Sequence, residues 1–380
     1  GANPYQFAPS EILHADPLSG QSDSERKDLE NLRRLALSRS LAQDILANVN
    51  NPTVVTIYPP FAQILFGISS VFFPLSVFGW RVVILFFDAI LIFVLIILLP
   101  RFGRDPRWVV VYAWSPLVLK EIVNTLHFDG IASAGVFLGI LFVLSRYPKR
   151  SILSWACATG TKIYPLLLVP FWVNKKEWKS WGLLGMILSG FLFLFSGSGL
   201  HGIRGWATFA QRWESNSSLV VVVEWLLGGI GVPSWGEGNI LFTLVGIPFS
   251  CDAFLIAKGV GMLFVIALAG FWSWKLGWNE SSDESRLYGT FILTGAILVW
   301  SPVCNPWYIA WIVPFLCFYP RLSWLYLSIA VFVHYTYFIP DPWGYLPYSR
   351  EIEYLPFFML LLIEWTTGRG VFRSTLSVRN

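Results

Sequence analysis

The feature that most restricts the fold of this chain is a series of apolar segments along most of its length. A backbone surrounded by lipid must satisfy its own hydrogen bonds, so segments of this kind are predicted to be helices. Only 13% of the 380 residues are charged, against about 25% in ordinary soluble proteins. The sequence therefore predicts an all-α polytopic membrane protein. The apolar segments are 60–77, 81–100, 108–123, 130–146, 151–173, 181–198, 250–277, 287–303, 307–320, 322–339 and 354–367.

Several of these segments are shorter than the roughly 20 residues that a straight helix needs to cross a bilayer. We therefore expect a transmembrane helix bundle that includes short re-entrant helices. Basic residues favour the cytoplasmic side, and basic groups at 146–150 and 174–179 flank the segment 151–173. We expect that segment to enter the membrane and return to the same side, with Lys162 at its tip. The polar turns that carry the candidate site then face the outer side.

Composition divides the chain into four regions. Residues 1–57 are polar and are expected to form a loop segment on the outer face. Residues 58–198 are expected to form the membrane module that carries the site, and residues 250–380 the C-terminal membrane helices. The region 199–249 is expected to be an outer interfacial loop. Its aromatic residues between positions 206 and 225 suggest one amphipathic helix on the membrane surface.

Charge and cysteine usage exclude several other classes of protein. The net charge of +4 is small and spread over short loops, so nucleic-acid binding is not expected. The four cysteines lie far apart in apolar surroundings without metal-ligand spacing, and we interpret them as packing residues. Twenty Trp and fourteen Tyr are typical of belts at the two membrane interfaces, although such rings could also line a sugar pocket.

The strongest candidate site combines a polar turn at 124–130 with a lysine inside an apolar segment. A lysine at the bilayer centre costs roughly 2.5–3.5 kcal/mol, so we expect Lys162 to meet an anion or line a wet cavity. A compact ammonium suits a phosphate, and Tyr164 is expected to bind the same anion. His127 and Asp129 in the turn are the candidate catalytic residues. The simpler interpretations are that Asp129 caps a helix and that Lys162 snorkels to an interface.

Other polar residues are weaker candidates. Trp213 and Asn216 could contact a sugar, or could belong to a loop that only anchors to headgroups. Asn305 is expected at the outer mouth of two short helices, where a plain turn would also explain the Asn-Pro pair. Asp88 and Glu364 lie within apolar segments, and charged residues at membrane depth are functional candidates by default.

Six short motifs follow one another in a characteristic order. They are Tyr58-Pro59-Pro60, Trp80-Arg81, Ser115-Pro116, His127-Phe128-Asp129-Gly130, Thr161-Lys162-Ile163-Tyr164-Pro165 and Asn305-Pro306-Trp307-Tyr308. In this order they resemble the polytopic GT-C glycosyltransferases, with the bacterial family 87 mannosyltransferases and the catalytic subunit of GPI mannosyltransferase I as the nearest types. The resemblance covers nearly the whole chain and implies a GT-C-type transmembrane helix bundle with outer-face loops.

The resemblance also implies an activity. A hexose, with mannose favoured, would move from a polyprenyl-phosphate donor to a lipid-linked or glycan acceptor, with inversion and without a nucleotide sugar. The reaction would take place on the periplasmic or lumenal face of a bacterial inner membrane or of the endoplasmic reticulum. The implied partners are the lipid-linked donor, the acceptor and membrane lipids. No tightly bound cofactor is expected, while a divalent metal and a protein partner stay open.

Roles carry over at individual positions. The resemblance matches Asp129 to the acidic residue of the second outer loop and Lys162 to the basic residue near the donor phosphate. It matches Tyr58 to the His or Tyr that precedes the double proline. In that family a catalytic Asp follows the first membrane helix and precedes a Gly-x-Asn-Pro-Tyr-like segment. This segment corresponds to residues 1–5, so the helix and the catalytic Asp are expected upstream of the sequence.

Two other functions stay open at this point. A lipid or anion flippase would use Lys162 to escort an anionic headgroup across the membrane. A non-catalytic membrane subunit would instead bind a partner enzyme. A cavity sealed on the cytoplasmic side would count against transport, because a transporter needs access from both faces.

Overall fold

The computed structural model describes residues 3–13, 22–195, 201–277, 281–339 and 346–367. Helices make up most of this part of the chain, which confirms an all-α membrane protein apart from one small hairpin. In the first half the elements are α1 (Pro9–Leu13), α2 (Asp23–Leu37), α3 (Ser40–Ala47), α4 (Pro60–Phe72), α5 (Val77–Arg101), η1 (Pro106–Val109), α6 (Val110–Ala113), α7 (Pro116–Val118), η2 (Leu119–Asn124), α8 (Asp129–Leu144), α9 (Pro148–Thr161), α10 (Pro165–Trp172) and α11 (Trp178–Phe193). In the second half they are α12 (His201–Arg212), α13 (Leu219–Gly229), β1 (Ile240–Leu244), β2 (Ile247–Ser250), α14 (Ala253–Gly277), α15 (Asp283–Val299), α16 (Pro306–Ile309), α17 (Val313–Leu316), α18 (Leu322–Ala330), η4 (Val331–Phe338) and α19 (Ser349–Thr367).

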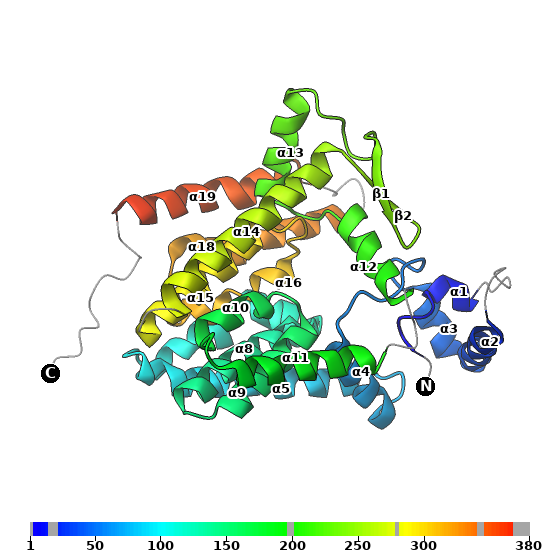
Figure 1. The fold of residues 1–380 in the computed structure, drawn as a ribbon, viewed down its shortest axis with the longest axis horizontal. Helices are drawn as coiled ribbons and strands as arrows, with labels where there is room; N and C mark the ends of the chain where they lie inside the picture. The colour runs from blue at the N-terminus through cyan, green and yellow to red at the C-terminus, as the bar shows by residue number, and fades with distance from the viewer. Residues whose placement is uncertain (1–2, 14–21, 196–200, 278–280, 340–345, 368–380) are drawn as a thin grey trace.

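The helices form two adjoining groups. Figure 1 shows α4, α5, α8, α9 and α11 in the lower half of the view and α14, α18 and α19 in the upper half. The short helices α10 and α16 lie between the two groups. The polar helices α1 to α3 stand apart at one side of the molecule. The candidate site is built where the two groups meet.

Few of the apolar segments form a single long helix. Among the described residues, α5 and α14 are long and apolar enough to cross a membrane. A third span is possible if residues 116–124 and 129–144 cross together, and these two stretches are bent by 110° relative to each other. Some of the other apolar segments are broken at proline or polar positions, as between α9 and α10, whereas α11, α15 and α19 are each a single helix. The structure therefore has fewer candidate spans than the expected GT-C bundle.

Helix α8 is the centre of the core and is packed closely against α9. Glycines on α8 allow this approach: a Cβ at Gly135 would lie 2.8 Å from the Cβ of Ala158, and one at Gly139 would lie 2.7 Å from Nε1 of Trp155. The Ser151 hydroxyl donates a hydrogen bond to the Gly139 carbonyl at 2.9 Å. Small residues and interhelical hydrogen bonds are typical of helix contacts in membranes. This contact fixes α8 and α9, whose ends carry the site.

The interfacial region differs from its prediction in two ways. The single amphipathic helix expected over 206–225 is wrong, because the chain breaks between α12 and α13. At the break, Ser215 N donates to the Pro302 carbonyl at 3.1 Å and Cys304 N donates to the Ser215 carbonyl at 2.8 Å. These backbone bonds cannot form from inside a continuous helix. The hairpin of β1 and β2 was not predicted; its turn residues Val245 and Gly246 have φ of 49° and 81°, as two-residue hairpin turns require.

Candidate functional site

The polar turn predicted at 124–130 is present and joins η2 to α8. Leu126 has a left-handed backbone conformation with φ of 64°, and its carbonyl accepts a hydrogen bond from Nε1 of Trp80 at 3.0 Å. A Cβ at Gly130 would lie 3.0 Å from Cγ2 of Ile122, so glycine allows the chain to fold back on itself here. The turn presents His127, Phe128 and Asp129 at the apex of the bend.

Asp129 is the first residue of α8 and is 1% exposed. Its Oδ1 accepts a hydrogen bond from Nε1 of Trp311 at 2.7 Å and lies 3.1 Å from Nζ of Lys162. Its Oδ2 is buried and has no hydrogen-bond partner among the described residues. The N-cap residue is Phe128, and no side chain caps the helix there. Asp129 is therefore part of an ion pair and does not act simply as a helix cap.

Lys162 lies at the break between α9 and α10, as the sequence predicted. Its backbone is extended, and Pro165 begins the next helix. The ammonium lies 4.7 Å from the ring centroids of both Phe128 and Tyr308, and 5.9 Å from that of Trp311. The side chain is only 13% exposed, so it does not snorkel away from the core. We call Phe128, Asp129, Lys162, Tyr308 and Trp311 the aromatic centre.

Two tyrosines border the aromatic centre. Tyr164 is buried and stacks on Trp311 with ring centroids 4.2 Å apart. Tyr58 is 40% exposed, and its ring meets the edge of Phe128 at 4.9 Å. Burial raises the pKa of Tyr58, so its hydroxyl keeps its proton at neutral pH and is a hydrogen-bond donor. Tyr58 is therefore the more exposed of the two tyrosines, and its ring borders Phe128 of the aromatic centre.

His127 is held by a carboxylate that sequence reasoning missed. Glu121 is fully buried, and its carboxylate accepts a hydrogen bond from the Tyr335 hydroxyl at 2.7 Å. Nδ1 of His127 lies 3.2 Å from Oε2 of Glu121, while its ring stacks on Trp307 at 4.0 Å. A carboxylate against Nδ1 fixes the ring and leaves Nε2 for another partner. The signal in the sequence was a glutamate within the apolar segment 108–123.

Three predicted substrate-binding residues lie near one another at the start of α16 and the end of α12. Asn216 is 2% exposed, and its amide donates to Oε2 of Glu353 at 2.8 Å. Asn305 accepts a hydrogen bond from the Ser215 hydroxyl at 2.7 Å and remains half-buried. Trp213 is half-buried, with Phe209 5.0 Å from its ring. Asn216 therefore has a structural partner, whereas Asn305 and Trp213 are partly accessible.

The buried polar residues around Asn216 tie three segments together. The Asn216 amide also donates to the Cys304 carbonyl at 3.3 Å, and the Tyr354 hydroxyl donates to the Asn216 carbonyl at 2.8 Å. Oε1 of Glu353 and Oδ1 of Asn216 are buried without hydrogen-bond partners among the described residues. We call Ser215, Asn216, Cys304, Glu353 and Tyr354 the corner.

The two remaining acidic candidates have structural partners. Asp88 accepts a hydrogen bond from the Tyr112 hydroxyl at 2.7 Å, which joins α5 to α6. Glu364 accepts from Leu322 N at 2.6 Å and from the Ser323 hydroxyl at 2.7 Å. It thereby satisfies backbone and side-chain donors at the first turn of α18. Neither carboxylate is paired with a lysine or arginine in the described structure.

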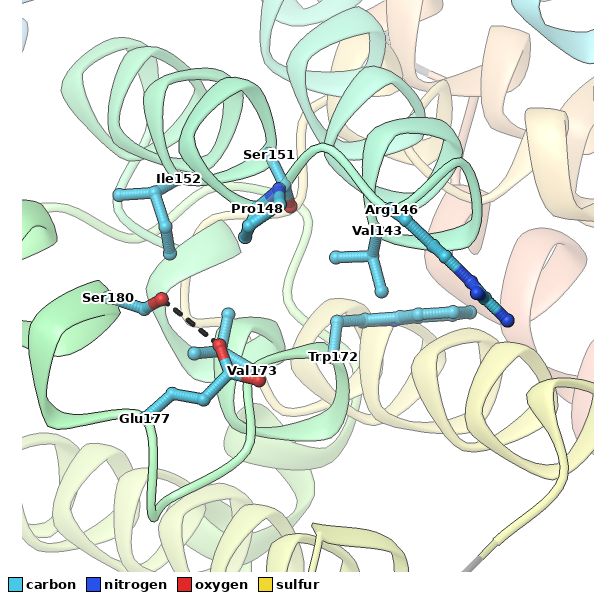
Figure 2. A pocket seen from close by; sticks show the side chains of 9 residues that line it. All are labelled: Val143, Arg146, Pro148, Ser151, Ile152, Trp172, Val173, Glu177 and Ser180. Carbon is cyan, nitrogen blue, oxygen red and sulfur yellow. Dashed lines mark hydrogen bonds between the residues drawn. The ribbon is translucent and has the colours of Figure 1, made fainter.

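A cavity of about 350 Å³ lies at the opposite end of α9. Figure 2 shows its lining, with Trp172 and Arg146 at one side and the Ser180 hydroxyl donating to Glu177 at the other. Lys162 follows the C-terminus of α9, and 14 helical residues span about 21 Å, so this cavity is separate from the aromatic centre. Its lining residues are Val143, Arg146, Pro148, Ser151, Ile152, Trp172, Val173, Glu177 and Ser180.

Metal-binding and cysteine chemistry have no support among the described residues. No group of three or more His, Cys, Asp or Glu side chains in this part of the chain could hold a metal ion. All four cysteines are free thiols, and Cys304 and Cys317 are buried. The divalent metal that the resemblance left open stays a prediction.

Comparison with known proteins identifies one part of the chain. Residues 55–175 match the family model MptA_B, described as alpha-(1->6)-mannopyranosyltransferase, N-terminal domain. The matched segment includes Tyr58, His127, Asp129 and Lys162. No match was found among curated proteins or among solved structures. The match agrees with the resemblance to GT-C and family 87 mannosyltransferases, and supports a mannosyl-transfer activity for a membrane protein.

Proposed function

We propose that this protein transfers a mannosyl residue from a polyprenyl-phosphate donor to a lipid-linked or glycan acceptor on the non-cytoplasmic face of a membrane. The observation that carries the proposal is the ion pair of Lys162 and Asp129 within the aromatic centre. It places a fixed positive charge beside buried rings, inside the segment that matches the mannosyltransferase family.

The donor phosphate is the proposed ligand of Lys162. An ammonium has three N–H donors, and the described residues supply one carboxylate oxygen to it. The remaining donors can bind phosphate oxygens, and the protonated hydroxyl of Tyr58 can add another bond from the accessible side. Tyr164 supports this arrangement by stacking on Trp311, which in turn holds Asp129.

The same charge favours the transition state over the bound donor. As the bond from the anomeric carbon to the phosphate oxygen breaks, negative charge builds up on the phosphate. A fixed ammonium among apolar rings stabilises that charge without reorganising, so its effect is larger in the transition state. The polyprenyl phosphate leaves with the bonding electron pair, and the acceptor oxygen forms the new bond to the anomeric carbon.

The acceptor hydroxyl is proposed to approach beside His127. Glu121 fixes the imidazole through Nδ1 and Trp307 covers one face, so Nε2 can orient the hydroxyl. The hydroxyl proton passes to a carboxylate base, as the resemblance implies. Asn305 has an amide group without a described protein acceptor and, with Trp213, is proposed to contact the sugar.

The test is a transfer assay with membranes that contain the full chain. Radiolabelled polyprenyl-phosphate mannose should yield labelled product with the wild type and almost none with Lys162→Met. The matched control is Lys258→Met, because Lys258 also lies in an apolar helix and donates to the Ala210 carbonyl far along the chain from the aromatic centre. If Lys162→Met transfers mannose at the wild-type rate, with equal amounts of folded protein in the two assays, Lys162 does not bind the donor phosphate and the aromatic centre is not the active site.

The same membranes distinguish the alternatives. A flippase would move labelled donor lipid between leaflets without forming a glycosidic bond, and Lys162→Met would slow that movement. A non-catalytic subunit would show neither activity, and would be recovered in a complex with a transferase. Transfer that depends on Lys162 is the outcome that the geometry favours.

A further inference from the structure

A cluster of exposed apolar side chains lies outside the candidate site, on α13 and the hairpin. Each of its members is at least 43% exposed. The stretch from 225 to 251 contains a single charged residue, Glu237. We call this cluster the apolar tip, and its members are Trp225, Leu226, Ile230, Trp235, Ile240, Leu241, Phe242 and Leu244.

Water is a poor solvent for the apolar tip. All five residues of β1 are exposed, and β1 pairs only with β2 in the described structure. An isolated two-stranded hairpin is marginally stable in water, and an exposed apolar strand tends to aggregate. Large exposed apolar side chains in such number usually mark an interaction surface. The apolar side chains of the tip are therefore expected to be buried against another surface.

The hydrocarbon core is equally unsuitable for the hairpin. Its strands have unpaired backbone groups at their outer edges, and such edges do not occur in contact with lipid chains. The boundary between headgroups and acyl chains meets both demands, because water and headgroups bind the edges while apolar side chains enter the lipid. Trp225 and Trp235 suit that boundary as well.

The connection to α14 places the tip beside a membrane helix. Strand β2 ends at Ser250 and α14, a candidate span, begins at Ala253. Asp252 fixes this junction, since its carboxylate accepts from Gly236 N at 3.0 Å and from Leu255 N at 2.8 Å. Figure 1 shows α13 and the hairpin together at the N-terminal end of α14, away from α5, α9 and α11.

A small core makes α13 and the start of α14 one unit. Val220, Phe254 and Ala257 are buried together, with Val223 and Leu227 packed against them. Trp235 lies 5.4 Å from the ring of Phe254. The exposed side of this unit is therefore held at a fixed position relative to the first turns of the candidate span.

We propose that the apolar tip is an anchor to the surface of the lipid bilayer, in which β1 and the end of α13 enter the headgroup and acyl boundary. The tip is almost uncharged, so the anchor recognises the apolar part of the bilayer and does not require anionic lipid. This inference is independent of mannosyl transfer, because none of the tip residues contacts the aromatic centre in the described structure.

The experiment attaches an environment-sensitive fluorophore to single cysteines in purified protein, reconstituted in vesicles of neutral phosphatidylcholine. The two half-buried thiols, Cys157 and Cys251, are first changed to Ser, while Cys304 and Cys317 are buried and are kept. Phe242→Cys and Ile230→Cys then supply two labelling sites on the tip. Glu30→Cys on the exposed face of α2 is the matched control. Brominated phosphatidylcholine then reports contact between the fluorophore and acyl chains.

Fluorophores at 242 and 230 should be blue-shifted relative to the one at 30, and brominated lipid should quench them at least about twofold more, as expected for about 5–10 Å of insertion. High salt should leave this quenching unchanged. Two labelling sites are used because the Phe242→Cys variant could disturb the hairpin, whereas Ile230 lies outside it. Solvent-like emission at both tip sites would overturn the proposal. A blue shift without quenching by brominated lipid would also overturn it if the shift increases with protein density or appears only when other membrane proteins are added. Either result would mean that another protein, and not lipid, covers the tip.

Discussion

The aromatic centre and the corner both contain a buried carboxylate with one oxygen that has no hydrogen-bond partner among the described residues, yet they differ in what surrounds it. At the aromatic centre, Oδ1 of Asp129 meets the ammonium of Lys162. At the corner, Oε2 of Glu353 accepts a hydrogen bond from the neutral amide of Asn216. A fixed ammonium near a partly exposed tyrosine suits a binding site, whereas hydrogen bonds to a neutral amide suit a structural joint.

The origin of the partners explains this difference. Asp129 and Lys162 are each placed at a helix end, where the backbone turns and the side chains converge from separate helices. Asn216 instead lies between α12 and α13 and bonds through its neutral amide to the Cys304 carbonyl and to Glu353. Removing a partner of Asp129 or Lys162 should therefore lower the rate of mannosyl transfer. Removing a partner of Asn216 should lower the free energy of unfolding.

The largest effect is expected when the whole ion pair is replaced. The double variant Lys162→Met with Asp129→Asn should lose transfer by about 10²–10³-fold, because the charge that stabilises the leaving phosphate is gone. Its thermal stability should stay close to wild type, since replacing both members of a buried pair is often neutral. Transfer assays and thermal unfolding in detergent measure the two effects. Loss of folding together with activity would show that the pair is structural.

A smaller loss of transfer is expected for Asp129→Asn alone. The amide can still accept a bond from Trp311, but Lys162 loses the negative charge that holds its ammonium in place. We expect transfer to fall by about 10–100-fold, or about 1.4–2.7 kcal/mol in the barrier, mainly through kcat. Asp88→Asn is the matched control, because the described partner of Asp88 is the Tyr112 hydroxyl. Equal losses in both variants would contradict a special role for Asp129.

The corner should respond in the opposite way. Asn216→Ala removes the amide that donates to Glu353, so that buried carboxylate loses one of its hydrogen bonds. We expect the free energy of unfolding to fall by about 1–3 kcal/mol, with transfer per folded molecule unchanged. Thermal unfolding and the transfer assay, normalised to folded protein, test this together. A selective loss of transfer would restore Asn216 as a sugar-binding residue.

The parts of the site that the sequence predicted depend on local chemistry. A charged residue in an apolar segment needs a partner, so a contact between Lys162 and an anion could be expected. Pro165 cannot continue a helix from the preceding residues, so the break near Lys162 could be expected as well. The polar residues 124–130 likewise predicted a turn. The aromatic partners could not be predicted, because Trp311 and Tyr308 reach Asp129 and Lys162 only through the packing of α16 and α17 on the first group of helices.

The errors came from long-range contacts. Asp88 and Glu364 are charged residues within apolar segments, as Lys162 is. Their hydrogen-bond partners, however, are the Tyr112 hydroxyl for Asp88 and the first turn of α18 for Glu364. The helix expected over 206–225 is broken by backbone bonds to residues 302–304, which no local pattern records. Glu121 was overlooked because its role depends on His127, six positions later across a sharp turn, and on Tyr335.

Among the variants of the aromatic centre, the smallest loss of transfer is expected for Trp311→Phe. Phenylalanine keeps an aromatic ring against Tyr164 and near Lys162, but it cannot donate a hydrogen bond to Oδ1 of Asp129. Losing one hydrogen bond to a charged group should lower stability by about 1.5–3 kcal/mol at most, and by less if Lys162 moves closer to the carboxylate. Because the ammonium remains paired, we expect transfer to fall by only about fivefold, from less exact placement of the charge. Steady-state kinetics and thermal unfolding measure both effects, and a loss as large as that of the double variant would mean that Trp311, and not the ion pair, organises the aromatic centre.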